Sequence, residues 1–143
     1  MIIAYMFILH FVADFIFQSR EMGQKKSSEF IWLAKHLAIQ TAFFLFGLMI
    51  VVNPLIALKI ALLNSLIHGV IDWNIWRLYK ASAYYRIKKE ADAFTISQEE
   101  KNKWMAESGK NWQYWNDHLF YTTIGFDQLL HGLTILAMAG LFL

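Results

Sequence analysis

The chain has 143 residues, of which 57% are hydrophobic and 17% are charged, and its formal net charge is +2. This length fits a single domain, and so small a net charge gives no reason to expect a nucleic-acid partner. The absence of cysteine excludes disulfides, thiolate metal ligands and cysteine nucleophiles. The apolar residues form long blocks, whereas the charged residues gather in two stretches, 20–35 and 77–117. This distribution is typical of a small multi-pass membrane protein.

Four apolar segments predict an all-α fold, a bundle of four transmembrane helices in one membrane domain over residues 1–143. The predicted spans cover about residues 1–18, 30–52, 54–79 and 118–143. The first span lacks the basic start and the small-residue cleavage site of a signal peptide, so we expect it to be retained. The third should begin with Asn53 as N-cap and Pro54 at the first helical position.

Two polar connectors separate these spans. The first, residues 19–29, carries Arg20, Lys25 and Lys26, which we interpret as residues that orient the protein in the membrane. The second is a helical insert over about 80–117, in which the third helix continues toward residue 93. Ser97 and Glu100 form a capping-box pattern that predicts a short helix over 98–107, ending at Ser108 and Gly109. This helix either lies in solvent or on the membrane, or covers a site as a lid.

The basic residues of both connectors predict how the chain lies in the membrane. Cytoplasmic loops are enriched in Lys and Arg, so we expect both connectors in the cytoplasm and both termini outside. The protein should then be a multi-pass protein of the inner, cytoplasmic membrane.

Polar side chains recur at helical spacing inside all four apolar segments. Three of the five histidines have an aspartate four residues away, which places each pair on one helix face. His10 and Asp14 are followed by Gln18 on the same predicted stripe, and His36 is followed four residues later by Gln40. In an up-and-down bundle these stripes lie at one depth, roughly 10 Å below the cytoplasmic boundary at 1.5 Å per residue.

These side chains predict an intramembrane metal site. The candidate ligands are His10, Asp14, His36, His68, Asp72, Asp127 and His131. Imidazole and carboxylate ligands suit zinc, manganese or iron, and seven of them would serve one or two divalent ions, with zinc the first choice. Asp14 and Asp127 are also the candidate catalytic residues. The residues expected to support the ligands or bind substrate are Gln18, Gln40, Asn64, Gln128 and Lys35. His118 we interpret as an interfacial or N-cap residue.

The polar stripes are also compatible with two roles that need no catalysis. Polar side chains cross-link membrane helices, so the cluster could merely fix the bundle of an interaction protein whose 80–117 insert engages a partner. A metal-ion or proton conductor is the other such role. It needs a polar path through the whole membrane, and the stretches 41–52 and 132–143 offer almost none.

The segments HFVADFIFQSR, KHLAIQ, HGVID and FDQLLH, with Lys25 or Lys26 between the first two, resemble the domain-of-unknown-function 3307 family. This resemblance implies a small integral membrane protein of bacteria or phages. More loosely, the chain is similar to inner-membrane proteins described as metal-dependent hydrolases. Its His-x-x-x-Asp helices are similar to those of the zinc-dependent phospholipase C and single-strand nuclease fold. The likeness implies a phosphoester hydrolase ancestry.

We therefore expect a membrane-embedded, metal-dependent hydrolase that acts on a lipid headgroup or another phosphoester. Membrane lipid is its expected partner, and the chain could also form a homo-oligomer or bind a host membrane protein. The alternatives are a non-enzymatic interaction or regulatory protein, such as one encoded by a phage, and an ion or proton conductor.

Overall fold

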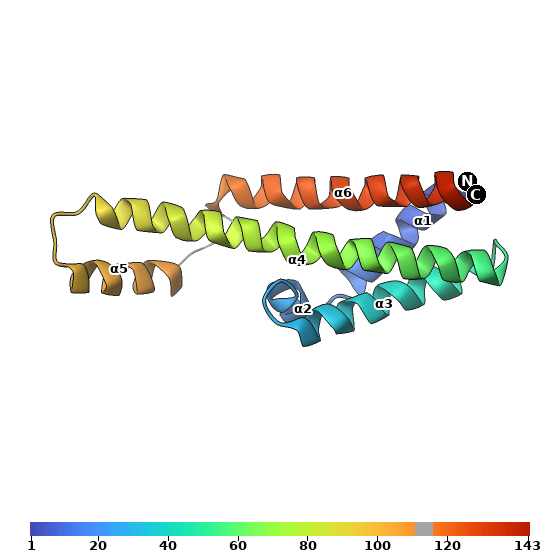
Figure 1. Cartoon of the computed structure of the whole chain (residues 1–143), viewed down its shortest axis with the longest axis horizontal. Coiled ribbons are helices and arrows are strands. Elements are labelled where there is room, and N and C mark those ends of the chain that lie inside the picture. The colour runs from blue at the N-terminus through green and yellow to red at the C-terminus, as the bar shows by residue number, and fades with distance from the viewer. Residues whose placement is uncertain (111–115) are drawn as a thin grey trace.

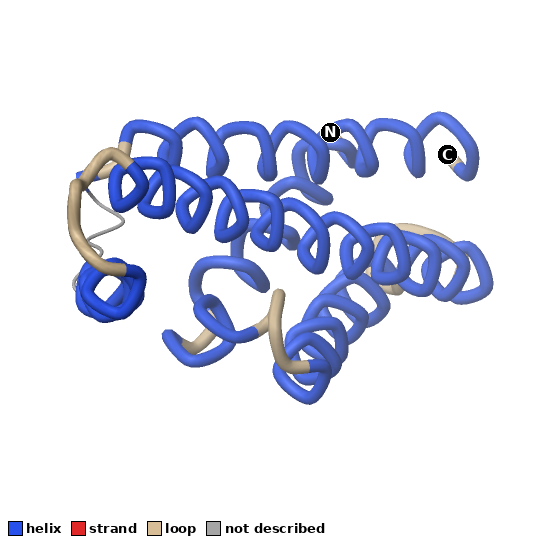
Figure 2. Tube along the Cα trace, turned by 60° about the vertical axis from the view of Figure 1, so that its left-hand side comes forward, coloured by secondary structure: helices blue, strands red, loops and turns tan. Residues whose placement is uncertain are grey.

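The computed structural model describes residues 1–110 and 116–143, and all its secondary structure in these ranges is helical (Figure 1). The elements are α1 (Ile2–Phe11), the π-helix η1 (Val12–Ile16), α2 (Arg20–Lys25), α3 (Phe30–Leu48), α4 (Pro54–Asp92), α5 (Gln98–Lys110) and α6 (His118–Phe142). The long helix α4 is central, with α3 and α6 packed along opposite sides of it (Figures 1 and 2). The predicted all-α class is confirmed.

Three described helices are long and apolar enough to cross a membrane, namely α3, α4 and α6. They correspond to the second, third and fourth predicted spans. The first apolar segment is shorter, because α1 and η1 together cover only Ile2–Ile16. At 1.5 Å per residue this segment is about 22 Å long, less than the roughly 30 Å of a bilayer core.

The bundle buries polar side chains and exposes apolar ones, which is the reverse of a water-soluble protein. On α4, Asn64, His68 and Asp72 are buried, whereas Leu66 and Val70 of the same turns are 65% and 57% exposed. A water-soluble monomer rarely exposes so continuous an apolar surface, but hydrocarbon tails suit it. This pattern supports a membrane location for the bundle.

The predicted helix starts agree with the structure where a side chain caps the helix. Asn53 Oδ1 accepts a hydrogen bond of 2.9 Å from the backbone N–H of Leu55, with Pro54 opening α4. Ser97 and Glu100 form the predicted capping box, in which the Ser97 backbone N–H and hydroxyl donate to Glu100 Oε2. The predicted end near residue 107 is wrong, because α5 continues through Gly109 to Lys110.

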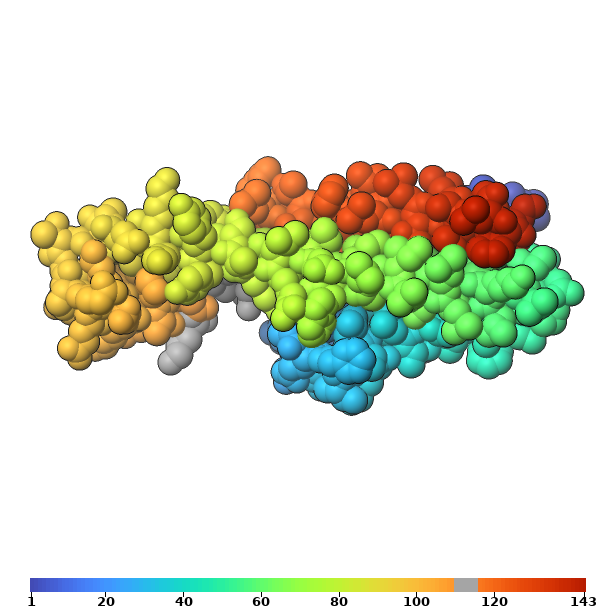
Figure 3. Space-filling model, in the orientation of Figure 1, coloured from blue at the N-terminus to red at the C-terminus, as the bar shows by residue number. Residues whose placement is uncertain are grey.

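Helix α5 lies beside the second half of α4, where Phe94 contacts Trp104 with ring centroids 5.1 Å apart. Together these segments project beyond the rest of the bundle (Figures 1 and 3). In this arrangement α5 does not cover the His and Asp side chains, so it does not take the position of a lid, which was one of its expected positions. Residues 111–115 of the predicted insert lie outside the described residues.

The first connector contains a short helix. Residues 20–25 form the helix α2, and Ser19 caps it by accepting a hydrogen bond of 3.3 Å from the Met22 N–H. Before it, the chain widens into a π-turn, shown by the 3.1 Å bond from the Phe17 N–H to the Val12 carbonyl. The helix ends at Ile16, so the predicted stripe stops at Asp14, and Gln18 is not its next member.

A glycine allows two helices to approach closely beside the polar cluster. A β-carbon at Gly69 of α4 would lie 2.8 Å from Leu37 Cδ1 of α3. These residues directly follow His68 and His36 in the sequence. The close approach therefore occurs at the level at which α3 and α4 present their histidines.

Candidate metal centre

The structure brings together all seven predicted ligand side chains from α1, η1, α3, α4 and α6. None is more than 5% exposed, and these side chains are His10, Asp14, His36, His68, Asp72, Asp127 and His131. Intramembrane ionisable groups are costly to bury and usually have a function. We call these seven residues the His/Asp cluster.

Four atoms of the cluster form a compact central group. The Nε2 atoms of His36 and His68 are 2.9 Å apart. Asp14 Oδ1 lies 3.1 Å from the His36 nitrogen and 3.3 Å from the His68 nitrogen. Asp72 Oδ2 lies 3.2 Å and 3.1 Å from the same two nitrogens. In a tetrahedral zinc site with bonds of 2.0–2.1 Å, neighbouring ligand atoms are about 3.3 Å apart, so each of these five distances is close to the separation of two zinc ligands.

The second oxygen of each central aspartate turns toward another histidine. Asp14 Oδ2 lies 3.6 Å from His10 Nε2. Asp72 Oδ1 lies 3.6 Å from His131 Nε2, and Asp127 Oδ1 lies at the same distance from that nitrogen. Asp14 and Asp72 are thus placed to bridge two neighbouring positions. Two-metal sites use such bridges to hold ions about 3.5–4 Å apart.

Several buried atoms of the cluster have no hydrogen-bond partner among the described residues. They include His10 Nε2, Asp72 Oδ1, Asp127 Oδ1 and His131 Nε2. An unpaired buried polar atom costs about 1–3 kcal/mol, and more if it is charged. All four are lone-pair donors toward a cation in one tautomer of the histidines. The donor set therefore fits metal ions.

Lys26 contacts the His/Asp cluster, and the sequence analysis did not predict this contact. Its side chain is 4% exposed, and Nζ lies 2.9 Å from Asp72 Oδ2 and 3.5 Å from His36 Nε2. Burial alone would lower the pKa of this ammonium, but the carboxylates of Asp72 and Asp14 outweigh burial and raise it. Its neighbour Lys25 is partly exposed and lies 3.6 Å from Glu29. The two lysines are adjacent in the sequence, so only the fold shows which of them is buried.

Two predicted supporting residues touch the ligands directly. Gln40 Nε2 donates a 2.6 Å hydrogen bond to Asp14 Oδ1 and lies 3.3 Å from His10 Nδ1. Gln128 Nε2 donates a 3.2 Å bond to Asp127 Oδ2. Such contacts fix the orientation of ligand side chains.

The remaining predicted supporting residues differ in position. Asn64 is buried one turn before His68, with no hydrogen-bond partner for its Nδ2 atom among the described residues. Lys35 is exposed, and its ammonium lies 4.4 Å from the ring centroid of Trp32. Lys35 is therefore in contact with an aromatic ring, and no contact places it in the His/Asp cluster among the described residues. His118 is exposed at the start of α6, whose N-cap is Asp117.

A cavity of about 450 Å³ connects the cluster to the surface. It is lined by Asp14 and Asp127 of the cluster and by the exposed Arg20. Gln18, Lys26 and Lys80 also line it, as do the aromatic side chains of Phe15, Trp76, Tyr79 and Phe120. Lys80 is held in place by hydrogen bonds that it donates to Ser27 Oγ at 2.8 Å and to the Gln24 carbonyl at 3.2 Å. The cavity thus combines basic and aromatic side chains beside the cluster.

Comparison with known proteins places the whole chain in one family. No curated protein and no solved structure matches it. The family described as "Protein of unknown function (DUF3307)" matches residues 2–143. The chain therefore belongs to the DUF3307 family.

Proposed function

We propose that this protein is a membrane-embedded hydrolase in which the His/Asp cluster binds two divalent metal ions. The observation that carries the proposal is the two-sided arrangement of Asp14 and Asp72. Each directs one oxygen to His36 and His68 and the other to a different histidine. A structural contact between helices requires neither this bridging geometry nor seven buried ligand-type side chains.

The ligands divide into two overlapping sets. His36 and His68 with Asp14 Oδ1 and Asp72 Oδ2 would hold one ion. The second ion would be held by His10 and His131 with the remaining oxygens of Asp14 and Asp72, which leaves Asp127 as a base beside it. Imidazole and carboxylate ligands favour zinc, while manganese and iron accept the same donors.

The reaction that fits this site is hydrolysis of a phosphoester. Bound divalent ions would polarise the phosphoryl oxygens and lower the pKa of a water between them. Asp127 lines both the cluster and the cavity, so it is placed to accept the proton of the attacking water. The water oxygen forms a bond to phosphorus, the bond to the ester oxygen breaks, and a proton ends on the departing alcohol. Lys26 is placed to bind a phosphoryl oxygen, because it lines the cavity beside Asp72.

We further propose that Ile2–Ile16 enters the membrane as a fourth apolar segment, with both termini outside the inner membrane. The termini and the turn between α3 and α4 lie at one end of the bundle (Figure 1). Most charged residues lie away from that end. Lipid is then the natural source of a substrate at the cluster.

The apolar packing beyond the cluster argues against an ion conductor. Toward the end that holds the termini, the helices bury Met6, Phe44, Leu48, Ile60 and Ile135 against one another. An ion would have to cross this dry core without polar ligands. The cluster is instead connected to the cavity lined by Arg20 and Lys80.

Metal analysis tests this proposal. We expect protein purified in detergent without chelator, then dialysed against trace zinc, to carry about two zinc ions per chain by plasma mass spectrometry. His68→Ala should lose at least one ion, since His68 faces both central carboxylates. The matched control, His118→Ala, removes an exposed histidine and should retain them. A wild-type protein with no bound zinc, manganese or iron would overturn the proposal.

A further inference from the structure

We infer that the substrate is a membrane lipid that ends in a phosphate monoester. Its phosphate would lie in the cavity beside the His/Asp cluster, and its hydrocarbon chain would lie in a groove between α4 and α6. This inference rests on the proposed hydrolase function and specifies its substrate.

The cavity offers two cations that no described carboxylate neutralises by an ion pair. Arg20 lines the cavity and forms no ion pair with a described residue. Among the described residues, Lys80 donates to two neutral oxygens, the Ser27 hydroxyl and the Gln24 carbonyl. Trp76 also lines this cavity, and its buried indole N–H has no described partner. These groups are the donors that a phosphate requires.

The charge of the cluster favours a monoester over a diester. Three carboxylates and the Lys26 ammonium face one another there. Two divalent ions would change their combined charge from minus two to plus two. A phosphate monoester carries about −1.5 to −2 at neutral pH, whereas a diester carries only one negative charge. The monoester dianion therefore neutralises the positive charge of the metal-loaded site more completely than a diester does.

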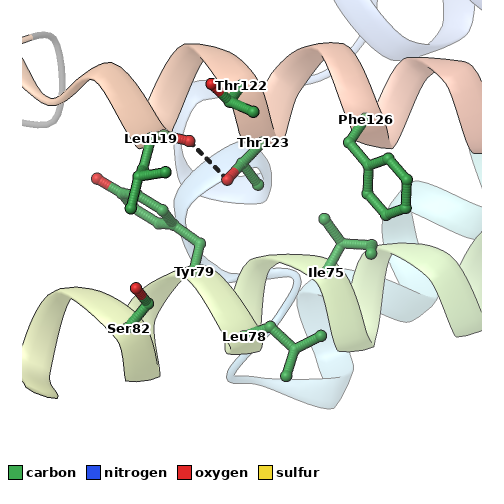
Figure 4. A pocket seen from close by; sticks show the side chains of 8 residues that line it. All are labelled: Ile75, Leu78, Tyr79, Ser82, Leu119, Thr122, Thr123 and Phe126. Carbon is green, nitrogen blue, oxygen red and sulfur yellow. Dashed lines mark hydrogen bonds between the residues drawn. The ribbon is translucent and has the colours of Figure 1, made fainter.

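A second hollow provides a place for the hydrocarbon chain. It lies between α4 and α6, has a volume of about 280 Å³ and is lined mainly by apolar side chains (Figure 4). Leu78 and Phe126 at its rim are 67% and 51% exposed, as expected for side chains in contact with lipid. Tyr79 lines both this groove and the cavity. A lipid lying across Tyr79 would keep its chain in the membrane while its phosphate reaches the cluster.

Tyr79 is fixed at this junction by a polar clamp. Its hydroxyl donates a 2.9 Å hydrogen bond to Asp117, which Arg86 grips through two bonds of 2.9 and 2.6 Å. Its ring contacts Trp76 and Phe120, with centroids 6.1 and 5.8 Å away. The shared wall is therefore an ordered aromatic surface, against which the first part of a lipid chain can pack.

Lipid binding tests the inference separately from catalysis. The probes are fluorescent dioleoyl phosphatidate and dioleoyl phosphatidylcholine in detergent micelles, with zinc content measured on the same samples. We expect phosphatidate to bind at least tenfold more tightly, and Arg20→Gln to reduce that preference several-fold. The double variant Lys88→Gln/Lys89→Gln removes exposed cations of α4 that do not line the cavity, so it should keep the preference.

The groove is tested by filling it. Thr123→Trp should weaken phosphatidate binding, whereas Leu133→Trp, on an exposed part of α6 outside the groove, should not. Inorganic phosphate in excess should displace the lipid only weakly, because it lacks the chain. If it competes as well as phosphatidate itself, the site is one for free phosphate and the lipid assignment is wrong.

The two proposals fail differently. Bound zinc without a preference for phosphatidate would overturn this inference and leave the metal centre intact. A preference for phosphatidate that depends on Arg20 in a protein that binds no metal would support the lipid site and overturn the hydrolase.

Discussion

His36 and His68 direct their Nε2 atoms at each other across 2.9 Å, although they come from different helices. A proton held between two imidazoles would satisfy this pair. Asp14 Oδ1 and Asp72 Oδ2 also lie within 3.3 Å of these nitrogens, and Gln40 and Lys26 contact these two oxygens from the other side. A cation placed beside His36 and His68 would interact with both ring nitrogens and with a carboxylate oxygen of Asp72. The two facing histidine nitrogens thus lie at the centre of the proposed metal site.

Replacing Lys26 by Met should destabilise the metal-free protein by about 3 kcal/mol, because the Asp72 carboxylate would remain buried without its ammonium partner. Bound zinc should reduce this loss of stability, since a divalent ion supplies the missing positive charge. The thermal unfolding midpoint in detergent, with chelator and with zinc, measures both effects.

Lys25→Met is the matched control for this change. Lys25 and Glu29 are 45% and 49% exposed, so removing their ion pair should cost at most about 0.5 kcal/mol in either condition. Equal losses of stability in the two variants would show that Lys26 does not stabilise the buried Asp72 carboxylate.

Gln40→Met should weaken zinc binding about tenfold without removing a ligand. Gln40 holds Asp14 through a 2.6 Å hydrogen bond, and such supporting contacts are worth 10- to 100-fold in metal affinity. Competition with a zinc-binding dye gives the affinity. Gln98→Met, on the exposed face of α5, should leave it unchanged. An unaltered affinity in Gln40→Met would mean that Asp14 is positioned by other contacts.

Asp117 should make the junction of α4 and α6 sensitive to acid. Hydrogen bonds from Arg86 lower the pKa of Asp117 to about 2, against the opposing effect of burial. Because the pKa is lower when folded, this stabilisation is present above about pH 4 and is lost as the pH falls through about 2. It amounts to about 2 kcal/mol.

The Asp117→Asn variant isolates this charge, because asparagine keeps the N-cap bond to the Leu119 N–H. Its unfolding midpoint should fall below that of the wild type at pH 6, and the difference should disappear near pH 2. Asp92→Asn, at the exposed end of α4, should match the wild type throughout. A difference that persists at pH 2 would assign the effect to packing.

The helical spacing of polar side chains in the four apolar segments was sufficient to predict which seven side chains meet. This worked because ligands four residues apart share a helix face, and because alternating helix directions place the pairs at one depth. The capping roles of Asn53 and Ser97 could also be predicted, since their hydrogen bonds are made to residues close in the sequence. What the sequence could not provide depends on tertiary contacts. The π-turn after Phe11 removes Gln18 from the stripe, and the helix α2 turns Lys26 rather than Lys25 inward.

Cysteine labelling tests how the chain crosses the membrane, and the absence of native cysteine makes single substitutions informative. Val51→Cys lies in the exposed turn between α3 and α4, and Glu99→Cys lies on α5. A membrane-impermeant maleimide should label residue 51 in intact cells, and residue 99 only after the membrane is opened. The basic connectors require this orientation if they are cytoplasmic.

Ile3→Cys, which is 41% exposed near the start of α1, tests the short first segment in the same experiment. It should be labelled from the outside, like residue 51, because the N-terminus lies at the same end of the bundle as the turn between α3 and α4 (Figure 1). Segment Ile2–Ile16 then reaches from the outer surface only to the depth of His10 and Asp14. Labelling from the cytoplasmic side would place the first segment in the opposite direction and separate its ligands from those of α4 and α6.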